Sequence, residues 1–330
     1  MTRKLFAVLM ALALVLGVFS GCGGGTTTSG SQSQAPAVES TPDSTPEPAA
    51  SSGNYKVYLI TMDQMDQHWV TVDAGCQKAV AELGNVDYQW AAPDVKDDAK
   101  QIECINNAIA GGADAILLAA NGPTAVTSVL KDVEAEGIKI VYVDSAADFP
   151  AVQTLATDNE AAGTTAGQEM LKALEAAGVT EGKIGIVNVN AATASVVARE
   201  NGFRAAFEGT GFEILETQYG DGDAAKSKDI AANYITQGCV GIFGTNEGST
   251  VGTGNAIQEA EGEGIIGVGF DKSDTILNLI SNGYLLCTMA QNPDVMGYEG
   301  MKTAVSALEG QAPASDTLDT GVSVIDASSL

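Results

Sequence analysis

Polar side chains that can bind hydroxyl groups recur along this chain just after short apolar runs. They are Asp66, His68, Trp69, Asn121, Asp144, Ser145, Arg199, Asn246, Asp271 and Gln291. Carboxylates accept hydrogen bonds from hydroxyls, amides both donate and accept, and a guanidinium donates to ring or hydroxyl oxygens. An indole face covers the apolar side of a sugar ring. The set therefore predicts a binding site for a hydroxylated small molecule.

Some of these residues also have an ordinary structural use. Aspartate and asparagine cap helices and form turns, which every strand-to-helix loop needs. Trp69, Arg199 and Gln291 are not capping residues. His68, the single histidine, could bind the ligand and make binding depend on pH, or could simply begin a helix at the rim of the site.

The same residues do not form a catalytic or metal centre. Asp66 and Asp144 could act as the acid–base pair of a hydrolase, but no activating group is positioned beside them. One histidine cannot build a His-rich metal site, and the acidic clusters 94–98 and 221–223 lack the order of an EF-hand loop. We therefore expect no enzymatic activity, no cofactor and no metal.

Strands and helices alternate from Tyr55 onwards. The predicted strands are 56–61, 86–91, 114–120, 138–143, 152–157, 183–189, 212–219, 240–245, 265–270 and 284–290. The predicted helices are 68–83, 97–110, 124–136, 159–177, 195–207, 224–237, 248–261, 275–282 and 295–308. This alternation predicts an α/β fold of parallel sheets covered by helices, and its break near 157–182 predicts two doubly wound lobes. Ligands of such sheets bind beyond the carboxyl ends of the strands, so we expect the polar residues to face a cleft between the lobes.

Five short stretches resemble the ribose/galactose-type periplasmic binding proteins of sugar ABC transporters. They are Val268-Gly269-Phe270-Asp271, Phe243-Gly244-Thr245-Asn246-Glu247, Arg199-Glu200-Asn201-Gly202-Phe203, Thr157-Asp158-Asn159 and Ala290-Gln291-Asn292-Pro293. The resemblance covers nearly all of 55–310. It implies that the lobes close on a sugar, which the protein then delivers to an ABC permease. It also implies sugar contacts at the matching positions Asp66, Trp69, Asn121, Asp144, Arg199, Asn246, Asp271 and Gln291.

The chain departs from that family at three places. Ser145 stands where an arginine is frequent, and His68 and Gly222 stand where aromatic residues are frequent. The site is therefore expected to have one cation and one aromatic wall fewer, which makes ribose itself a less suitable ligand.

Charge in the expected cleft points to the ligand class. The carboxylates Asp66, Asp144 and Asp271 face a single cation, Arg199, so an anionic ligand would be repelled. We expect a neutral or amine-bearing monosaccharide or polyol. A furanosyl autoinducer or a nucleoside remains an alternative, and so does a role as sensory partner of a chemoreceptor or kinase.

The balance of charge over the whole chain excludes other classes. Against 42 acidic residues stand 16 lysines and arginines, a net charge of −26, which repels nucleic acid. A sugar-responsive repressor with the same fold is disfavoured, because no helix-turn-helix pattern precedes Tyr55 and the chain begins with an export signal.

The N-terminal segment predicts export and lipid anchoring. Arg3 and Lys4 precede an apolar run over 5–19, and Cys22 directly follows two small residues, as in a bacterial lipobox. We expect a signal peptide over 1–21, acylation of Cys22 and a disordered tether over 22–54. An ordinary secretory signal or an uncleaved membrane anchor is the alternative. The protein is then expected as a lipid-anchored monomer on the extracytoplasmic face of the cell membrane.

The predicted lobes are discontinuous in sequence. Residues 55–157 and 292–317 form the N-terminal lobe, and residues 158–291 and 318–330 form the C-terminal lobe. Four further cysteines, Cys76, Cys104, Cys239 and Cys287, are expected as buried thiols. The first two fall on helices at opposite faces of one sheet, and the last two on strands that are not neighbours.

Overall fold

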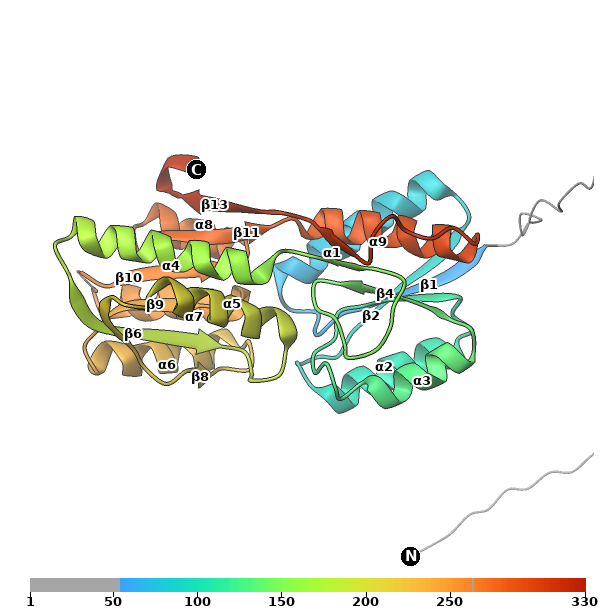
Figure 1. Ribbon diagram of the computed structural model, residues 1–330, viewed down its shortest axis with the longest axis horizontal. Coiled ribbons are helices and arrows are strands. Elements are labelled where there is room, and N and C mark those ends of the chain that lie inside the picture. Colours follow the sequence, from blue (N-terminus) through green and yellow to red (C-terminus); the bar gives the residue numbers. More distant parts are fainter. Residues whose placement is uncertain (1–53, 263) are drawn as a thin grey trace, which may run out of the picture. The chain divides into compact units, whose positions relative to one another are not determined.

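Two parallel sheets organise the chain in the computed structural model, which describes residues 54–262 and 264–330 (Figure 1). The first sheet has the strand order β12-β5-β4-β3-β1-β2, and its paired strands all run parallel. Its strands are β1 (Tyr55–Ile60), β2 (Val86–Ala91), β3 (Ala115–Leu118), β4 (Lys139–Val143), β5 (Thr154–Ala156) and β12 (Thr317–Asp319). Its helices are α1 (Gln67–Leu83), α2 (Asp98–Ala110), α3 (Thr127–Ala135) and α9 (Pro293–Leu308).

The second sheet has the order β13-β11-β10-β9-β6-β7, and β8 also pairs with β6. Its paired strands run parallel except at the edge, where β13 is antiparallel to β11. Its strands are β6 (Glu181–Asn188), β7 (Gly211–Ile214), β8 (Gln218–Tyr219), β9 (Cys239–Gly244), β10 (Ile266–Phe270), β11 (Cys287–Gln291) and β13 (Val322–Asp326). Its helices are α4 (Asn159–Ala176), α5 (Ala194–Ala206), α6 (Ala224–Thr236), α7 (Glu247–Glu259) and α8 (Asp274–Ser281), and a short 3₁₀ helix, η1 (Ala327–Ser329), ends the chain.

The order of strands reverses at the same point in both sheets. β1 lies between β2 and β3, and β6 lies between β7 and β9, so each sheet is wound in both directions from its first strand. The predicted fold of two doubly wound parallel-sheet lobes is therefore confirmed. The single strand predicted over 212–219 is instead two short strands, β7 and β8.

The core of the first lobe follows from strands that are apolar on both faces. All four residues of β3 are buried. Leu117 packs into the cluster under α1 and α9, whereas Ile116 and Leu118 pack into the cluster under α2 and α3. Successive strand residues point to opposite faces, so one run of apolar residues supplies two layers of core.

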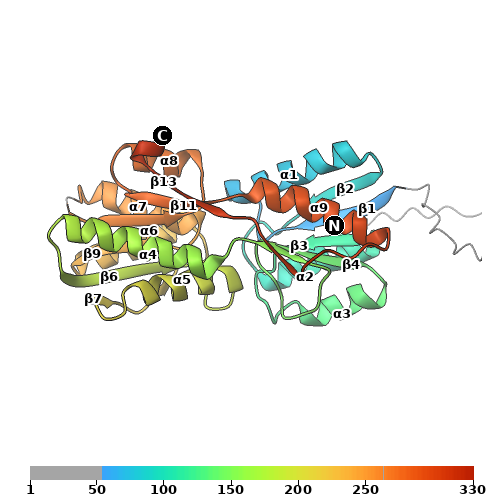
Figure 2. The same cartoon turned by 45° about the horizontal axis from the view of Figure 1, so that its top comes forward.

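The chain passes between the two sheets at three places, and these crossings are hydrogen-bonded to one another (Figure 2). Thr157 Oγ1 donates to Gln291 Oε1 over 2.9 Å, and Asn292 Nδ2 donates to the carbonyl of Thr320 over 2.7 Å. The third crossing follows β12, which ends at Asp319, two residues past the predicted lobe boundary at 317.

The four described cysteines lie apart from each other. Cys76 packs on the α1 face of the first sheet and Cys104 on the opposite face, as predicted. Cys239 on β9 and Cys287 on β11 have β10 between them. None of these four thiols is bonded to another.

The predicted signal peptide (1–21), Cys22 and nearly all of the predicted tether (22–54) lie outside the described residues. Within residues 54–262 and 264–330, no helix combines the length and the apolar character that crossing a membrane requires.

Candidate functional site

Polar side chains from both lobes meet in one cavity at the carboxyl ends of the strands. It is lined by every residue predicted for the site except Asn121 and Ser145: Asp66, His68, Trp69, Asp144, Arg199, Asn246, Asp271 and Gln291. The cavity has about 20 Å³ of free volume, room for a water molecule but not for a sugar ring. Most of its space is taken by the side chains themselves, which pair with one another.

Asp144 and Asp271 occupy equivalent positions in the two lobes. Asp144 directly follows β4 and Asp271 directly follows β10, and each donates its backbone amide to the neighbouring strand, at Leu155 and Met289. Both have positive φ angles, 64° and 72°. This conformation is uncommon for residues other than glycine, and backbone strain of this kind gathers at functional sites.

His68 lies between these two carboxylates. Its Nε2 is 3.1 Å from Asp144 Oδ2, and its Nδ1 is 3.5 Å from Asp271 Oδ1. The contact with Asp144 is close but not aligned as a hydrogen bond, so Nε2 is left without a hydrogen-bond partner. Burial alone would lower the pKa of His68, but the contact with Asp144 and the charges of Asp271 and Asp144 outweigh it and raise the pKa above 6.5.

Trp69 supports the same corner of the site. Its side chain is buried, and its ring meets that of His68 edge-on at 4.6 Å. The indole Nε1 donates to Asp63 Oδ2 over 3.3 Å. Trp69 thus borders the cavity, as predicted, while its other side packs into the core of the first lobe.

Arg199 lies in the middle of α5 and is buried. Its Nε donates to Asn159 Oδ1 over 2.8 Å, its Nη1 donates to the carbonyl of Thr245 over 3.0 Å, and its guanidinium stacks over the ring of Phe270 at 3.8 Å. Nη2 lies 3.6 Å from Asp144 Oδ2 and has no hydrogen-bond partner. One donor of a fixed, buried cation is therefore left facing the cavity.

Two glycines allow α5 to bring Arg199 this close to α4. A Cβ on Gly163 would lie 2.0 Å from the carbonyl oxygen of Arg199, and a Cβ on Gly202 would lie 2.0 Å from that of Glu160. Any side chain at either position would push the two helices apart and move Arg199 away from the cavity.

The second lobe contributes a connected set of polar groups. Gln291 Nε2 donates to Asp271 Oδ1 over 2.5 Å, and the backbone amide of Glu247 donates to Asp271 Oδ2 over 2.8 Å. Asn246 caps α7 by accepting from the amide of Ser249, and its Nδ2 lies 3.4 Å from Asp66 Oδ2. Asn246 therefore has the capping role and also lines the site.

The structure places Asn121 and Ser145 differently from the prediction. Asn121 Nδ2 donates to Asp98 Oδ1 over 2.5 Å, and the Asn121 carbonyl accepts from Thr193 Oγ1, so it lies behind the cavity wall. Ser145 lines a separate groove near the crossings, together with Thr157. Both follow strands as expected, but the Asn121 amide nitrogen pairs with Asp98, and Ser145 Oγ is buried without a hydrogen-bond partner.

Lys96 is a second cation at the site, one that the sequence patterns did not single out. It lies in the loop between β2 and α2, and its ammonium forms ion pairs with Asp63 and, over 2.9 Å, with Asp66. Burial alone would lower the pKa of Lys96, but these two charges outweigh it and raise it. The expectation of a single cation is therefore wrong. The signal in the sequence is its position, because Lys96 follows the second strand just as the predicted site residues follow other strands.

Glu247 is a further carboxylate that the prediction omitted, although it adjoins Asn246. Its Oε2 accepts from the backbone amide of His68 over 3.1 Å, which links the two lobes. Burial, together with the charges of Asp66 and Asp271, raises the pKa of Glu247 to about 7. Glu247 can therefore hold a proton near neutral pH.

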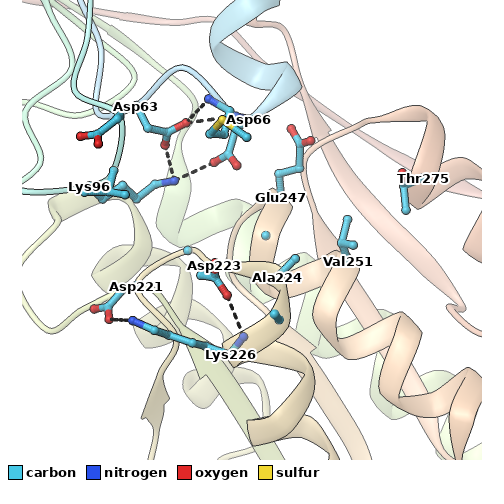
Figure 3. Close-up of a pocket in the computed structure, with 16 residues that line it drawn as sticks. Asp63, Asp66, Lys96, Asp221, Asp223, Ala224, Lys226, Glu247, Val251 and Thr275 are labelled. Atoms are coloured by element: carbon cyan, nitrogen blue, oxygen red, sulfur yellow. Dashed lines mark hydrogen bonds and ion pairs between the residues drawn. The ribbon is translucent and has the colours of Figure 1, made fainter.

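A larger cavity of about 580 Å³ opens beside the first one (Figure 3). It shares Asp66 and Lys96 with the inner cavity and extends along Glu247 to the loop before α6. The acidic residues at its rim are paired: Asp94 with Lys100, and Asp221 with Lys226. Asp94 and Asp221 are therefore exposed carboxylates that pair with lysines at the surface.

Residues 57–312 match the family described as periplasmic binding protein domain. The chain is 29% identical over 247 residues to the ribose import binding protein RbsB of Haemophilus influenzae, covering 74% of this chain and 82% of that protein. It is 27% identical over 276 residues to the D-allose-binding periplasmic protein of Escherichia coli, covering 78% and 86%.

Solved structures agree. A carbohydrate transporter solute binding protein from Agrobacterium radiobacter, in complex with D-arabinose, has a TM-score of 0.80 and 28% identity, covering 84% of this chain and 96% of that one. A solute binding protein of an ABC transporter from Agrobacterium vitis, with bound D-fucose, has a TM-score of 0.78 and 26% identity, covering 83% and 99%. The resemblance stated from the sequence is confirmed: the chain belongs to the ribose/galactose type of the periplasmic binding protein family and is a binding protein, not an enzyme.

Proposed function

We propose that this protein captures a neutral or amine-bearing monosaccharide or polyol by closure of its two lobes and delivers it to an ABC permease. The observation that carries the proposal is the single cavity in which Asp144 and Trp69 of one lobe face Arg199 and Asp271 of the other. A hydroxylated molecule in this cavity can contact both lobes only when they are closed, so its binding favours the closed state. The names of the relatives, with ribose and allose, and the sugars in the similar structures support a sugar.

The charge of the site supports a ligand without negative charge. Carboxylates surround the inner cavity and its opening: Asp63, Asp66, Asp144, Asp271 and Glu247. They are opposed by Lys96, Arg199 and, when it is protonated, His68. The sequence predicted Arg199 as the only cation of the site, and Lys96 is a second one. The carboxylates still outnumber the cations, so an anionic ligand would be repelled in this water-poor space.

A calorimetric screen of the mature chain tests the ligand class. The neutral probes are D-ribose, D-allose, D-arabinose, D-galactose and D-fucose, the amine-bearing probe is D-galactosamine, and the anionic probes are D-galacturonate and ribose 5-phosphate. Adenosine represents the nucleosides. We expect one or more neutral or amine-bearing sugars to bind, and Arg199→Ala to abolish that binding because it removes the cation between Asp144 and Phe270.

Three results would contradict the proposal. Tighter binding of an anionic probe than of every neutral probe would refute the charge argument. If adenosine bound and none of the sugars did, the proposal of a sugar ligand would be refuted. Chemical conversion of a bound probe would refute a role in capture and delivery.

We also propose that the protein is held at the extracytoplasmic face of the cell membrane by a lipid on Cys22. The support is the sequence pattern before Cys22, because this residue lies outside the described part of the chain. Cys22→Ala in the full chain should move the protein from the membrane fraction to the soluble fraction and abolish labelling by a fatty acid. Labelling that persists in this variant would refute the site of acylation.

A further inference from the structure

Lys96 stands between the two cavities at the mouth of the cleft. Its side chain lines both the inner cavity and the larger outer one. Figure 3 shows it among the residues of the outer cavity. Only 8% of the side chain is exposed, although it belongs to a loop at the surface of the first lobe. Lys96 therefore forms part of the wall that separates the inner cavity from the outer cavity.

The second lobe makes room for Lys96 at Gly222. A Cβ on this glycine would lie 2.8 Å from Lys96 Nζ and 2.9 Å from Cε, closer than real side chains approach. Gly222 also has a φ of +71°, which favours glycine. The ammonium of Lys96 therefore occupies space that a side chain at position 222 would need. A residue larger than glycine at 222 would displace it.

Lys96 has a donor left over for a ligand. An ammonium group has three N–H donors, and two of them are directed to the carboxylates of Asp63 and Asp66. Within residues 54–262 and 264–330, no other acceptor is recorded for Nζ. Because the carboxylates of Asp63 and Asp66 already offset the positive charge of Lys96, we expect its third N–H to bind a neutral oxygen rather than an anion.

Two further polar atoms of the inner cavity make no hydrogen bond. His68 Nε2 and Arg199 Nη2 are buried, line this cavity and have no hydrogen-bond partner. Both lie near Asp144 Oδ2, at 3.1 Å and 3.6 Å, and an oxygen of a ligand can supply the hydrogen bond that this carboxylate does not.

We propose that Lys96 is a specificity-determining residue of this site. It donates a hydrogen bond to a hydroxyl oxygen of a neutral sugar or polyol and seals the inner cavity against the outer one, in space that only a glycine at 222 leaves free. The proposal rests on the proposed function, and it adds that recognition extends from the strand ends to the loop between β2 and α2.

The test measures the affinity and the dissociation rate of D-ribose, D-galactose and their monodeoxy analogues for wild type and Lys96→Met. Methionine keeps most of the shape of lysine and removes the donor. For the sugar that binds wild type, we expect Lys96→Met to lower the affinity by 10-fold or more and to raise the dissociation rate. For the one deoxy analogue that lacks the contacted oxygen, the substitution should change the affinity less than 3-fold.

This dependence on a single hydroxyl separates recognition from a purely structural role. If Lys96 only offset the charges of Asp63 and Asp66, Lys96→Met would weaken the binding of every analogue by the same factor, and that result would overturn the proposal. Lys100→Met is the matched control, because Lys100 lies on the same segment but pairs with exposed Asp94. It should leave all affinities unchanged.

Two further variants keep the test decisive. Lys96→Arg retains the charge and should stay folded where Lys96→Met does not; its longer, planar group should change the order of preference among the analogues. Gly222→Ala should weaken the same sugars, because its Cβ displaces the ammonium. If sugars bind and all three variants retain the wild-type pattern, only the role of Lys96 is refuted. If none of the sugars binds wild type, the proposed function itself fails, and this proposal with it.

Discussion

Asp144 and Asp271 hold the same imidazole from opposite lobes, at 3.1 Å from His68 Nε2 and 3.5 Å from His68 Nδ1. The two carboxylates follow equivalent strands of the two sheets. Because His68 contacts one carboxylate of each lobe, these charge contacts link the lobes. A sugar that enters this space must replace the charge contacts that His68 makes with Asp144 and Asp271.

Closure of the lobes should therefore depend on pH through His68. Its raised pKa means that the protonated form is favoured where both carboxylates contact it. Because the pKa is raised, this stabilisation is complete below the ordinary value of 6.5 and is lost as pH rises through the raised pKa. Arg199 and Glu247 also face His68, the first opposing its charge and the second accepting from its amide.

Small-angle scattering without added sugar, between pH 5 and pH 9, checks this prediction. The radius of gyration should increase with pH for wild type and should depend less on pH for His68→Gln. Identical profiles for the two proteins would show that another group governs closure.

Glu247 should destabilise the folded protein at alkaline pH. Its pKa of about 7, against 4.5 ordinarily, means that the folded protein binds a proton that the unfolded chain releases between these values, so stability falls as pH rises through this window. The full shift corresponds to about 3 kcal/mol, and since Glu247 is partly exposed we expect about 1 kcal/mol.

Glu247→Gln keeps an oxygen for the amide of His68 and removes the titration. It should be more stable than wild type by about 1 kcal/mol at pH 8 in urea unfolding, and the difference should vanish near pH 4. Glu259→Gln, at the exposed end of α7, is the control and should show no such trend. A Glu247→Gln advantage that is constant from pH 4 to pH 8 would exclude this titration as its cause.

Trp69 should report sugar binding by its fluorescence. The indole borders the inner cavity, whereas Trp90 lies on β2 and donates to Thr61 Oγ1 over 2.9 Å. In Trp90→Phe the response to a bound sugar should remain, and in Trp69→Phe it should be lost. The opposite pattern would place the sugar away from Trp69.

Asp144 and Asp271 should prefer glycine to alanine once their side chains are removed. An L-residue in the left-handed region costs about 1–2 kcal/mol, which glycine does not pay. We expect Asp271→Gly to be more stable than Asp271→Ala by about 1 kcal/mol in urea unfolding. At Asp73, inside α1, the order should reverse, because glycine weakens a helix interior by about 1 kcal/mol relative to alanine. The same order at both positions would mean that the positive φ at Asp271 carries no strain.

The sequence by itself determined the fold and most of the polar residues that line the inner cavity. Alternating apolar strands and amphipathic helices can bury their apolar faces only in layered parallel sheets, and such sheets gather the residues that follow their strands at one edge. Asp66, Asp144, Asn246, Asp271 and Gln291 were therefore predictable from position alone, and the resemblance to a family pointed to the same residues.

Only the tertiary structure decided which partner each of these side chains has. Asn121 follows β3 as predicted, yet its amide is taken by Asp98, a residue of the neighbouring helix. Lys96 reaches Asp66, 30 residues earlier, because two loops of the first lobe meet beside Gly222 of the second. Strand periodicity places a residue at an edge, but the direction of a loop side chain depends on charges and space supplied by distant segments, which no local pattern contains.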